Sequence, residues 1–309
     1  MRVRNVLLFV VLAVVWGSAF TAIKAGLDFF PPVLFAAFRF DVAGVVMLGY
    51  AAYVTDRWRP RSREEWAVVA AGGSLMIAAY HAFLFVGEQQ EGVTSAAAAI
   101  VVSLSPILTT GFARVLLPDE RLTTTGLVGL LVGFVGVGVL SNPDPANLFD
   151  ARTVSLSLVF VAVACFALGS VLTRRADDDL PVETMEAWSM VLGAGLMHVA
   201  SVGVGESVGA VEWTGDALLA LAYLAVVASS LGFLIYFTLL ERLGPIEINL
   251  VSYAAPVAAA ATGLVVLDER PTPYTVAGFL LILVGFSLIK RRELRSELSS
   301  LRDRVEETG

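Results

Sequence analysis

The sequence predicts an all-α integral membrane protein in which ten transmembrane helices form two inverted repeats of five helices each. Three observations lead to this prediction. The 309-residue chain is 57% hydrophobic and only 16% charged, whereas about a quarter of the residues of a soluble domain are charged. Apolar stretches long enough to cross a bilayer follow one another along the whole chain. A pattern of proline, acidic and glycine residues from the first half returns in the second half.

The expected spans are continuous apolar segments. This continuity indicates helices, because a barrel strand would alternate polar and apolar residues over about ten positions. Short connections rich in proline, such as Phe30-Pro31-Pro32 and Pro271-Thr272-Pro273, separate several of the segments. The spans are expected at residues 6–25, 32–54, 66–87, 93–116, 123–141, 153–173, 183–204, 217–240, 246–267 and 274–291.

The arginines predict the orientation, because cytoplasmic loops of membrane proteins carry an excess of basic residues. With the N-terminus inside, the outer loops hold mainly acidic residues, such as Asp28, Glu88 and Glu212. The cytoplasmic side then holds Arg2, Arg4, Arg57, Arg59, Arg61, Arg63, Arg114, Arg121, Arg174, Arg175, Arg242 and the cluster Lys290-Arg291-Arg292. We therefore expect a multi-pass protein of the plasma (cell) membrane with both termini in the cytoplasm and a charged cytoplasmic tail at 292–309.

The charge and the cysteine content limit the kinds of partner that the protein can bind. The net charge is −7, and no long basic stripe lies outside the membrane flanks, which argues against binding to nucleic acid. Cys165 is the only cysteine, so an intramolecular disulfide is excluded and a thiolate zinc site is not expected. No metal and no cofactor are expected. The expected partners are the lipid bilayer and a small-molecule substrate, and leucine spacing in the tail leaves a homodimer open.

An internal repeat relates two halves, which we place at residues 5–141 and 153–291. Each half contains a proline, then Asp-Glu-Arg, then glycines nine and sixteen residues after the glutamate. These residues are Pro106, Asp119-Glu120-Arg121, Gly129 and Gly136 in the first half, and Pro256, Asp268-Glu269-Arg270, Gly278 and Gly285 in the second. Because five spans is an odd number, the second copy must cross the membrane in the opposite orientation, as in many transporters.

The segment Val15–Phe20 followed by Arg39-Phe40 resembles the start of the EamA domain of the drug/metabolite transporter superfamily. The segments Leu104–Arg121 and Ala255–Arg270 are similar to the most recognisable part of that domain. The resemblance covers about residues 5–290. It implies ten helices, cytoplasmic termini and the carriage of small metabolites, often the export of amino acids.

Polar and aromatic residues inside the expected spans are the candidates for a substrate cavity, since such a cavity would suit a small amphipathic solute. Arg39 stands out because ionisable residues at membrane depth are costly. Its guanidinium could hold a substrate carboxylate or clamp neighbouring helix ends. The serines could instead permit close helix packing. The candidate residues are Trp16, Ser18, Arg39, Tyr80, His81, Ser105, Pro106, Trp188, Ser229, Tyr236, Asn249, Tyr253 and Pro256.

Pro106 and Pro256 are expected near the middle of the fourth and ninth spans. Each proline would free the carbonyl four residues earlier, so it could line or hinge the cavity, or simply kink its helix. Asp41 could pair with another helix or carry a proton. Lys24 and His198 lie near span ends and are expected to reach the interface.

These observations favour a secondary transporter that moves a small organic metabolite, an amino acid or a related compound, by alternating access, with export as the expected direction. No Gly-rich Lys-Ser/Thr loop is present, so ATP is not the direct energy source. The alternatives from other classes are a membrane-embedded enzyme and a channel or sensory scaffold. The sequence has no His-Glu-x-x-His motif, so we expect no enzyme and assign no catalytic residue.

Overall fold

The computed structural model describes residues 3–90, 92–116, 124–142, 149–175, 180–243, 248, 250–289 and 291. All regular structure within these residues is helical and forms ten successive spans. The Asp119–Arg121 turn, Asn249 and the tail 292–309 lie outside the described residues. The all-α fold with ten spans is confirmed.

The helix bounds follow the expected spans closely. The first half consists of α1 (Val3–Gly26), α2 (Pro32–Val54), α3 (Arg63–Ala71), η1 (Gly72–Ala79), α4 (Tyr80–Glu88), α5 (Ser95–Val102), α6 (Ser105–Leu116) and α7 (Thr124–Ser141). The second half consists of α8 (Ala151–Arg175), α9 (Val182–Gly203), the short η2 (Val208–Ala210), α10 (Gly215–Ala222), η3 (Tyr223–Leu231), α11 (Gly232–Leu243), α13 (Val251–Leu267) and α14 (Pro273–Ile289). The third span joins α3, η1 and α4, the fourth joins α5 and α6, and the eighth joins α10, η3 and α11.

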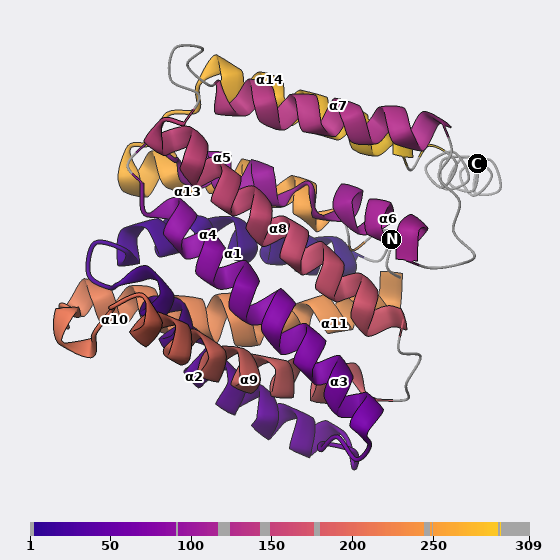
Figure 1. The fold of residues 1–309 in the computed structure, drawn as a ribbon, viewed down its shortest axis with the longest axis vertical. Helices are drawn as coiled ribbons and strands as arrows, with labels where there is room; N and C mark the ends of the chain where they lie inside the picture. The colour runs from indigo at the N-terminus through magenta and orange to yellow at the C-terminus, as the bar shows by residue number, and fades with distance from the viewer. Residues whose placement is uncertain are drawn as a thin grey trace.

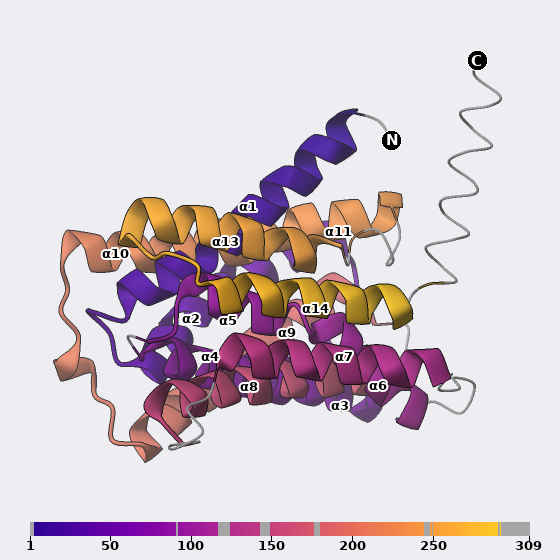
Figure 2. The same ribbon diagram turned by 90° about the horizontal axis from the view of Figure 1, so that it is seen from above.

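Equivalent helices of the two halves pack as pairs. Helix α7 lies against α14 and α2 lies against α9, and these two pairs form opposite edges of the bundle (Figure 1). Helix α1 packs on α13 between them, and its first turns extend beyond the bundle in the view of Figure 2. The start of α1 and the end of α14 lie at the same end of the molecule in both views, as an even number of crossings requires.

The repeated glycines show how the halves are related. A Cβ added at Gly129 would meet the carbonyl oxygen of Gly285 at 2.5 Å, and one at Gly136 would meet that of Gly278 at 2.9 Å. The first glycine of one repeat therefore faces the second glycine of the other. This reversed order of the glycine contacts requires α7 and α14 to run antiparallel. Because they are equivalent helices of the two repeats, the repeats are inverted.

The surface of the bundle is apolar enough for lipid. Seven helices of the described residues have the length and hydropathy of membrane spans, and α13 and α14 are shorter apolar helices. Large hydrophobic side chains such as Val199 and Val265 are exposed along the outside of the helices. A surface of this kind is a liability in water and is the expected one in a bilayer.

Pro106 and Pro256 have different effects on their helices. The fourth span is interrupted by a turn at Ser103 and Leu104, and Pro106 is the second residue of the new helix α6. Pro256, by contrast, lies inside the continuous helix α13 and is buried. The break at Pro106 follows from its missing N–H group and from the steric clash of its ring with the preceding turn.

Two equivalent spans contain π-helical segments. They are η1 in the third span and η3 in the eighth. Hydropathy gave no sign of either segment. A π-turn inserts an extra residue into the helical register and is frequent at functional sites. Their occurrence in repeat-related spans directs attention to the residues on and beside them.

Candidate substrate site

Arg39 of α2 is a basic residue buried within the bundle. Its side chain is only 7% exposed, and its Nε donates a hydrogen bond to Ser229 Oγ of η3 at 2.9 Å. The guanidinium carbon lies 5.2 Å from the centre of the Phe40 ring. Arg39 makes no other hydrogen bond to a described residue. One donor of the guanidinium is therefore held by η3, and its two NH₂ groups are left for another partner.

His81 and Tyr80 form an aromatic wall beside Arg39. Both lie in the first turn of α4, directly after η1. The His81 ring is 4.3 Å from the Phe40 ring and 4.6 Å from that of Tyr80, and its Nδ1 hydrogen-bonds the carbonyl of Ile77 at 2.9 Å. This bond orients the imidazole against α2.

Trp16 of α1 is held on the other side of η3. Its Nε1 donates to the carbonyl of Ala228 at 3.2 Å, and its ring lies 5.5 Å from that of Tyr236. The indole fits because position 232 is glycine, where a Cβ would approach Trp16 Nε1 to 2.7 Å. The carbonyl that accepts from Trp16 directly precedes Ser229, so η3 joins Trp16 and Arg39.

Ser18 adds a hydroxyl group to this arrangement. Its Oγ lies 2.6 Å from the hydroxyl of Tyr223, the first residue of η3, and also donates to the Val14 carbonyl at 2.6 Å. Tyr223 was not among the expected residues. The central polar cluster is defined here as Trp16, Ser18, Arg39, Tyr80, His81, Tyr223, Ser229 and Tyr236. It combines one cation, several hydroxyls and aromatic rings from the first, second, third and eighth spans.

The other expected residues make contacts elsewhere. Trp188 donates from Nε1 to the Trp58 carbonyl in the α2–α3 loop at 2.9 Å. The Tyr253 ring lies tilted against that of Phe286 of α14, with 4.5 Å between the ring centres. Their contacts tie helices and loops together. That these two residues line the substrate path stays a prediction.

Ser105 and Pro106 lie at the break within the fourth span, and Pro256 lies inside the helix of the ninth span. Ser105 and Pro106 begin α6 after the break, and Pro256 follows Ala255, whose carbonyl oxygen would lie 2.4 Å from a Cβ at Gly17. Pro256 thus lies beside a close approach of α1 and α13, and Ser105 and Pro106 lie directly after the break between α5 and α6. Asn249 lies outside the described residues.

Asp41 and Lys24 find partners within the protein. The Asp41 carboxylate lies 2.8 Å from His198 Nε2 of α9 on a partly exposed face of the bundle. Asp41 therefore pairs with another helix, one of the two roles expected for it. Lys24 Nζ donates to the main-chain carbonyls of Glu88 at 2.8 Å and Gln90 at 2.6 Å.

The structure corrects the location expected for Glu88. This residue was assigned to an outer loop, because it is followed by Gln89, Gln90 and Glu91. In the structure it is the last residue of α4 and its side chain is fully buried. The polar run after it gave no indication that Glu88 belongs to the helix and is buried.

The halves are tied together at both ends of the bundle. At the end that carries the α1–α2 turn, which is the predicted outer end, Glu269 Oε2 accepts from the Ser95 main-chain N–H at 2.8 Å. Glu206 of the α9–α10 connection accepts from the main-chain N–H groups of Val33 and Leu34, at 3.1 and 2.8 Å, where α2 begins. These bonds close the predicted outer end with side chains of the second half on backbone of the first.

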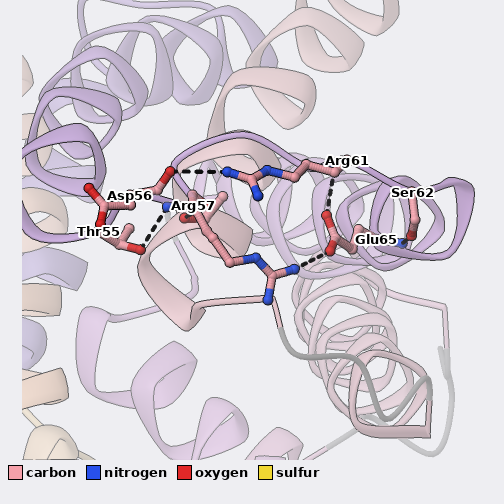
Figure 3. Close-up of polar contacts among 7 residues, drawn as sticks. Thr55, Asp56, Arg57, Arg61, Ser62 and Glu65 are labelled. Atoms are coloured by element: carbon pink, nitrogen blue, oxygen red, sulfur yellow. Dashed lines mark hydrogen bonds and ion pairs between the residues drawn. The ribbon is translucent and has the colours of Figure 1, made fainter.

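The α2–α3 loop makes the corresponding contact at the opposite end. The Glu65 carboxylate accepts from the Arg57 guanidinium and from the Arg61 main-chain N–H, and Ser62 caps α3 by accepting from Glu65 N at 3.0 Å (Figure 3). The loop held in this way presents the Arg57 carbonyl to Thr184 Oγ1 of α9 at 2.9 Å. Together with the bond from Trp188, this bond closes the predicted inner end.

The family of the chain follows from comparison with known proteins. The EamA-like transporter family matches residues 3–142 and 153–291, one copy in each half. The chain belongs to the EamA-like transporter family. It is therefore a membrane transporter rather than an enzyme.

Relatives agree with this membership, and a solved structure shares the fold. An uncharacterized transporter of Archaeoglobus fulgidus is 30% identical over 90% of this chain and 95% of its own length. The uncharacterized inner membrane transporter YedA of Escherichia coli strain K12 is 29% identical over 82% of this chain and 79% of its own. A probable terminal-alkyne amino-acid exporter of Streptantibioticus cattleyicolor is 28% identical over 92% and 93%. A solved crystal structure, 22% identical, has the same fold with a TM-score of 0.66 and covers 96% of this chain and 100% of its own.

Proposed function

We propose that this EamA-like transporter is a secondary carrier that exports small organic solutes bearing a carboxylate, amino acids or closely related compounds, by alternating access. It would do so in the plasma membrane with both termini in the cytoplasm. The observation that carries the proposal is the buried guanidinium of Arg39, with only its Nε bonded to a described residue. The relative named as a probable amino-acid exporter supports the substrate class.

The geometry around Arg39 favours substrate binding over the alternative role as a clamp on helix ends. A guanidinium offers five N–H donors in a planar fork that matches a carboxylate. Here the protein uses the Nε donor, through Ser229 Oγ. A buried charge with unpaired donors is costly, so a bound carboxylate would satisfy the group. Rings of Tyr80, Trp16 and Tyr236 would flank the rest of the solute.

The inverted repeat supports alternating access. Two related halves of opposite orientation can exchange conformations, so that one scaffold opens to either side. The hydrogen bonds that close the two ends run between the halves, as such an exchange needs. The central polar cluster lies on helices from both halves, α1, α2 and α4 from the first and η3 and α11 from the second.

The experiment is uptake of a labelled panel of amino acids and related solutes into proteoliposomes that contain the purified protein. Arg39→Ala should abolish saturable uptake, because loss of one partner of a buried charged hydrogen bond costs about 2–5 kcal/mol, roughly 30-fold or more in affinity. Arg39→Lys should restore part of it. Arg174→Ala, at an exposed arginine, is the matched control and should behave as wild type.

Two results would contradict the proposal. If Arg39→Ala transported a carboxylate solute with the wild-type KM, Arg39 would be a structural clamp. If flux through the wild-type protein rose linearly with solute concentration and never saturated, the protein would be a channel. Comparing each acidic solute with its amide separates recognition of the carboxylate from recognition of the remaining groups.

A further inference from the structure

Glu88 is the one carboxyl group among the described residues that is completely withdrawn from solvent. It ends α4 at 0% exposure, and neither of its carboxylate oxygens has a hydrogen-bond partner among the described residues. No ion pair within 4.0 Å joins it to a described residue. An ionised carboxylate in such a place would lose its hydration without compensation. The geometry therefore suits the neutral acid.

Basic groups lie near Glu88 but are directed elsewhere. Lys24 of α1 and Arg39 of α2 are both within electrostatic range of its carboxyl group. The Lys24 ammonium, however, donates to the main-chain carbonyls of Glu88 and Gln90. Arg39 donates to Ser229, and Arg152, at the start of α8, donates to the Leu140 carbonyl at 3.2 Å. Positive charge is thus close enough to receive a carboxylate, yet does not pair with it in the closed arrangement.

The remaining groups around Glu88 are acidic or neutral. Glu269, in the turn after α13, is also within electrostatic range and would oppose a second negative charge. Tyr80 and His81 lie two turns earlier on α4 itself, and η1 and α5 contribute no charged residue. Glu91 lies outside the described residues.

The contacts that shut this end of the bundle are made by Lys24 and Glu269, both within electrostatic range of the Glu88 carboxyl group. Glu269 holds the start of α5 through Ser95 N, and Lys24 holds the residues that follow α4. Just outside, a hollow of about 410 Å³ is lined by residues that include Leu27 and Gln89. If these contacts part, water from the hollow would reach Glu88, the residue that precedes Gln89.

We propose that the carboxyl group of Glu88 is a proton-binding site that links opening of the predicted outer end to pH. In the closed arrangement Glu88 holds its proton. When the Glu269 and Lys24 contacts part, the carboxyl O–H bond breaks and the proton passes to a water molecule, leaving a carboxylate beside Lys24 and a hydronium ion in the outer solution. Closing the end reverses the step. The role of this site in transport rests on the proposed function, whereas proton binding itself does not.

Proton binding can be tested on the full-length protein in lipid nanodiscs, without a substrate. A carboxyl group that binds its proton more tightly in the folded protein than in the unfolded chain stabilises the fold at low pH, and this stabilisation disappears as the pH rises through its titration. The thermal-unfolding midpoint of the wild type should therefore fall over that interval. Glu88→Gln mimics the neutral acid and should remove the fall. Glu212→Gln, at an exposed carboxyl of the same end, should leave the fall in place.

Infrared difference spectra between low and high pH give a second readout. The wild type should show a carbonyl stretching band of a protonated carboxyl group, which is lost in Glu88→Gln and kept in Glu186→Gln, a variant of another buried acid. If the band and the pH dependence persist in Glu88→Gln, or disappear only in Glu186→Gln, the proposal is wrong. Should Glu88→Gln not fold, Glu88→Asp must still shift the band.

A transport assay with a pH gradient distinguishes the failure of this proposal from the failure of the proposed function. For any solute carried in the liposome panel, a pH gradient should change the wild-type rate, and Glu88→Gln should carry the solute with no response to the gradient. If no solute is carried but the infrared band depends on Glu88, the proposed substrate class fails and the proton site stands. If a solute is carried and Glu88→Gln still responds to the gradient, the proton site does not govern opening.

Discussion

Replacing Gly129 by alanine tests the antiparallel contact between α7 and α14, on which the inverted repeat depends. A Cβ at this position would lie 2.5 Å from the carbonyl oxygen of Gly285 and 2.8 Å from Ile289 Cγ1. The first of these atoms is backbone and cannot rotate away. At Gly138, in the same helix, a Cβ would meet nothing within 4 Å. Gly129→Ala and Gly138→Ala therefore make the same chemical change with and without an obstacle.

The expected magnitude follows from the overlap. Ordinary contact begins at 3.4 Å, so α14 has to retreat by about 0.9 Å (3.4 − 2.5) to accept the new methyl group. Overpacking of this kind costs about 1–3 kcal/mol. Both variants gain the same helix propensity, about 1 kcal/mol for each glycine replaced by alanine, and this gain cancels in their difference. Gly129→Ala should thus be about 1–3 kcal/mol less stable than Gly138→Ala.

Thermal unfolding of the purified proteins in one detergent, followed by size-exclusion chromatography after heating, measures this difference. With about 2–4 °C per kcal/mol for domains of 150–250 residues, the Gly129→Ala midpoint should lie several degrees below that of Gly138→Ala. Gly285→Ala should behave like Gly129→Ala, since its Cβ would lie 2.6 Å from the Gly129 carbonyl oxygen. Equal midpoints for Gly129→Ala and Gly138→Ala would refute the close approach of the two helices.

Three further changes test other parts of the fold. In a cysteine-free background, Arg121→Cys and Arg270→Cys should react with a membrane-impermeant thiol reagent from opposite sides of sealed vesicles, and labelling from the same side would exclude the inverted topology. Asp268 ends α13 in the left-handed conformation with φ 53°. Asp268→Gly should therefore raise the unfolding free energy by about 1 kcal/mol, the cost of that conformation for a residue with a Cβ, and a lower thermal midpoint would contradict this. Thr21 Oγ1 and Thr262 Oγ1 lie 2.7 Å apart between α1 and α13. A double-mutant cycle with valine at both positions should therefore give about 0.6 kcal/mol of coupling energy, the average for such bonds in membranes. Zero coupling energy would mean that the two hydroxyls do not interact.

Much of the fold was predictable because a bilayer imposes a simple rule on sequence. Each span must be an apolar helix of nearly fixed length, and the described helix ends fall within three residues of the expected ones except at the start of α13. There, residues 244–247 and 249 lie outside the described residues. The spacing of Gly129 and Gly136 from the Asp-Glu-Arg motif was equally informative, because its repetition at Gly278 and Gly285 anticipated which helices would meet.

The site was predictable in its chemistry more than in its geometry. Arg39 stood out as an ionisable residue inside a span, and the structure brings Ser229, Tyr80 and His81 next to it. Hydropathy could not reveal that η1 and η3 leave the α-helical register, because a π-turn changes the hydrogen-bond pattern without changing the composition. It also could not show that Glu88 is buried, since α4 packs mainly against α8, which is distant in sequence.

Each end of the bundle is closed by a few hydrogen bonds between the halves, and closures of this modest strength are what a carrier requires. Thr184 and Trp188 each make one bond from α9 to the α2–α3 loop at the predicted inner end. At the predicted outer end Glu269 and Glu206 accept from backbone N–H groups. With about 0.5–1.5 kcal/mol net for each neutral bond and about 1.5–3 kcal/mol for each bond to a charged group, the predicted outer end is held more firmly than the predicted inner end. Both closures still amount to a few kcal/mol, the scale on which minor conformations are populated. One proton at Glu88 changes such a balance by about 1.4 kcal/mol for each pH unit across its titration, which is enough to shift the preferred side of opening tenfold.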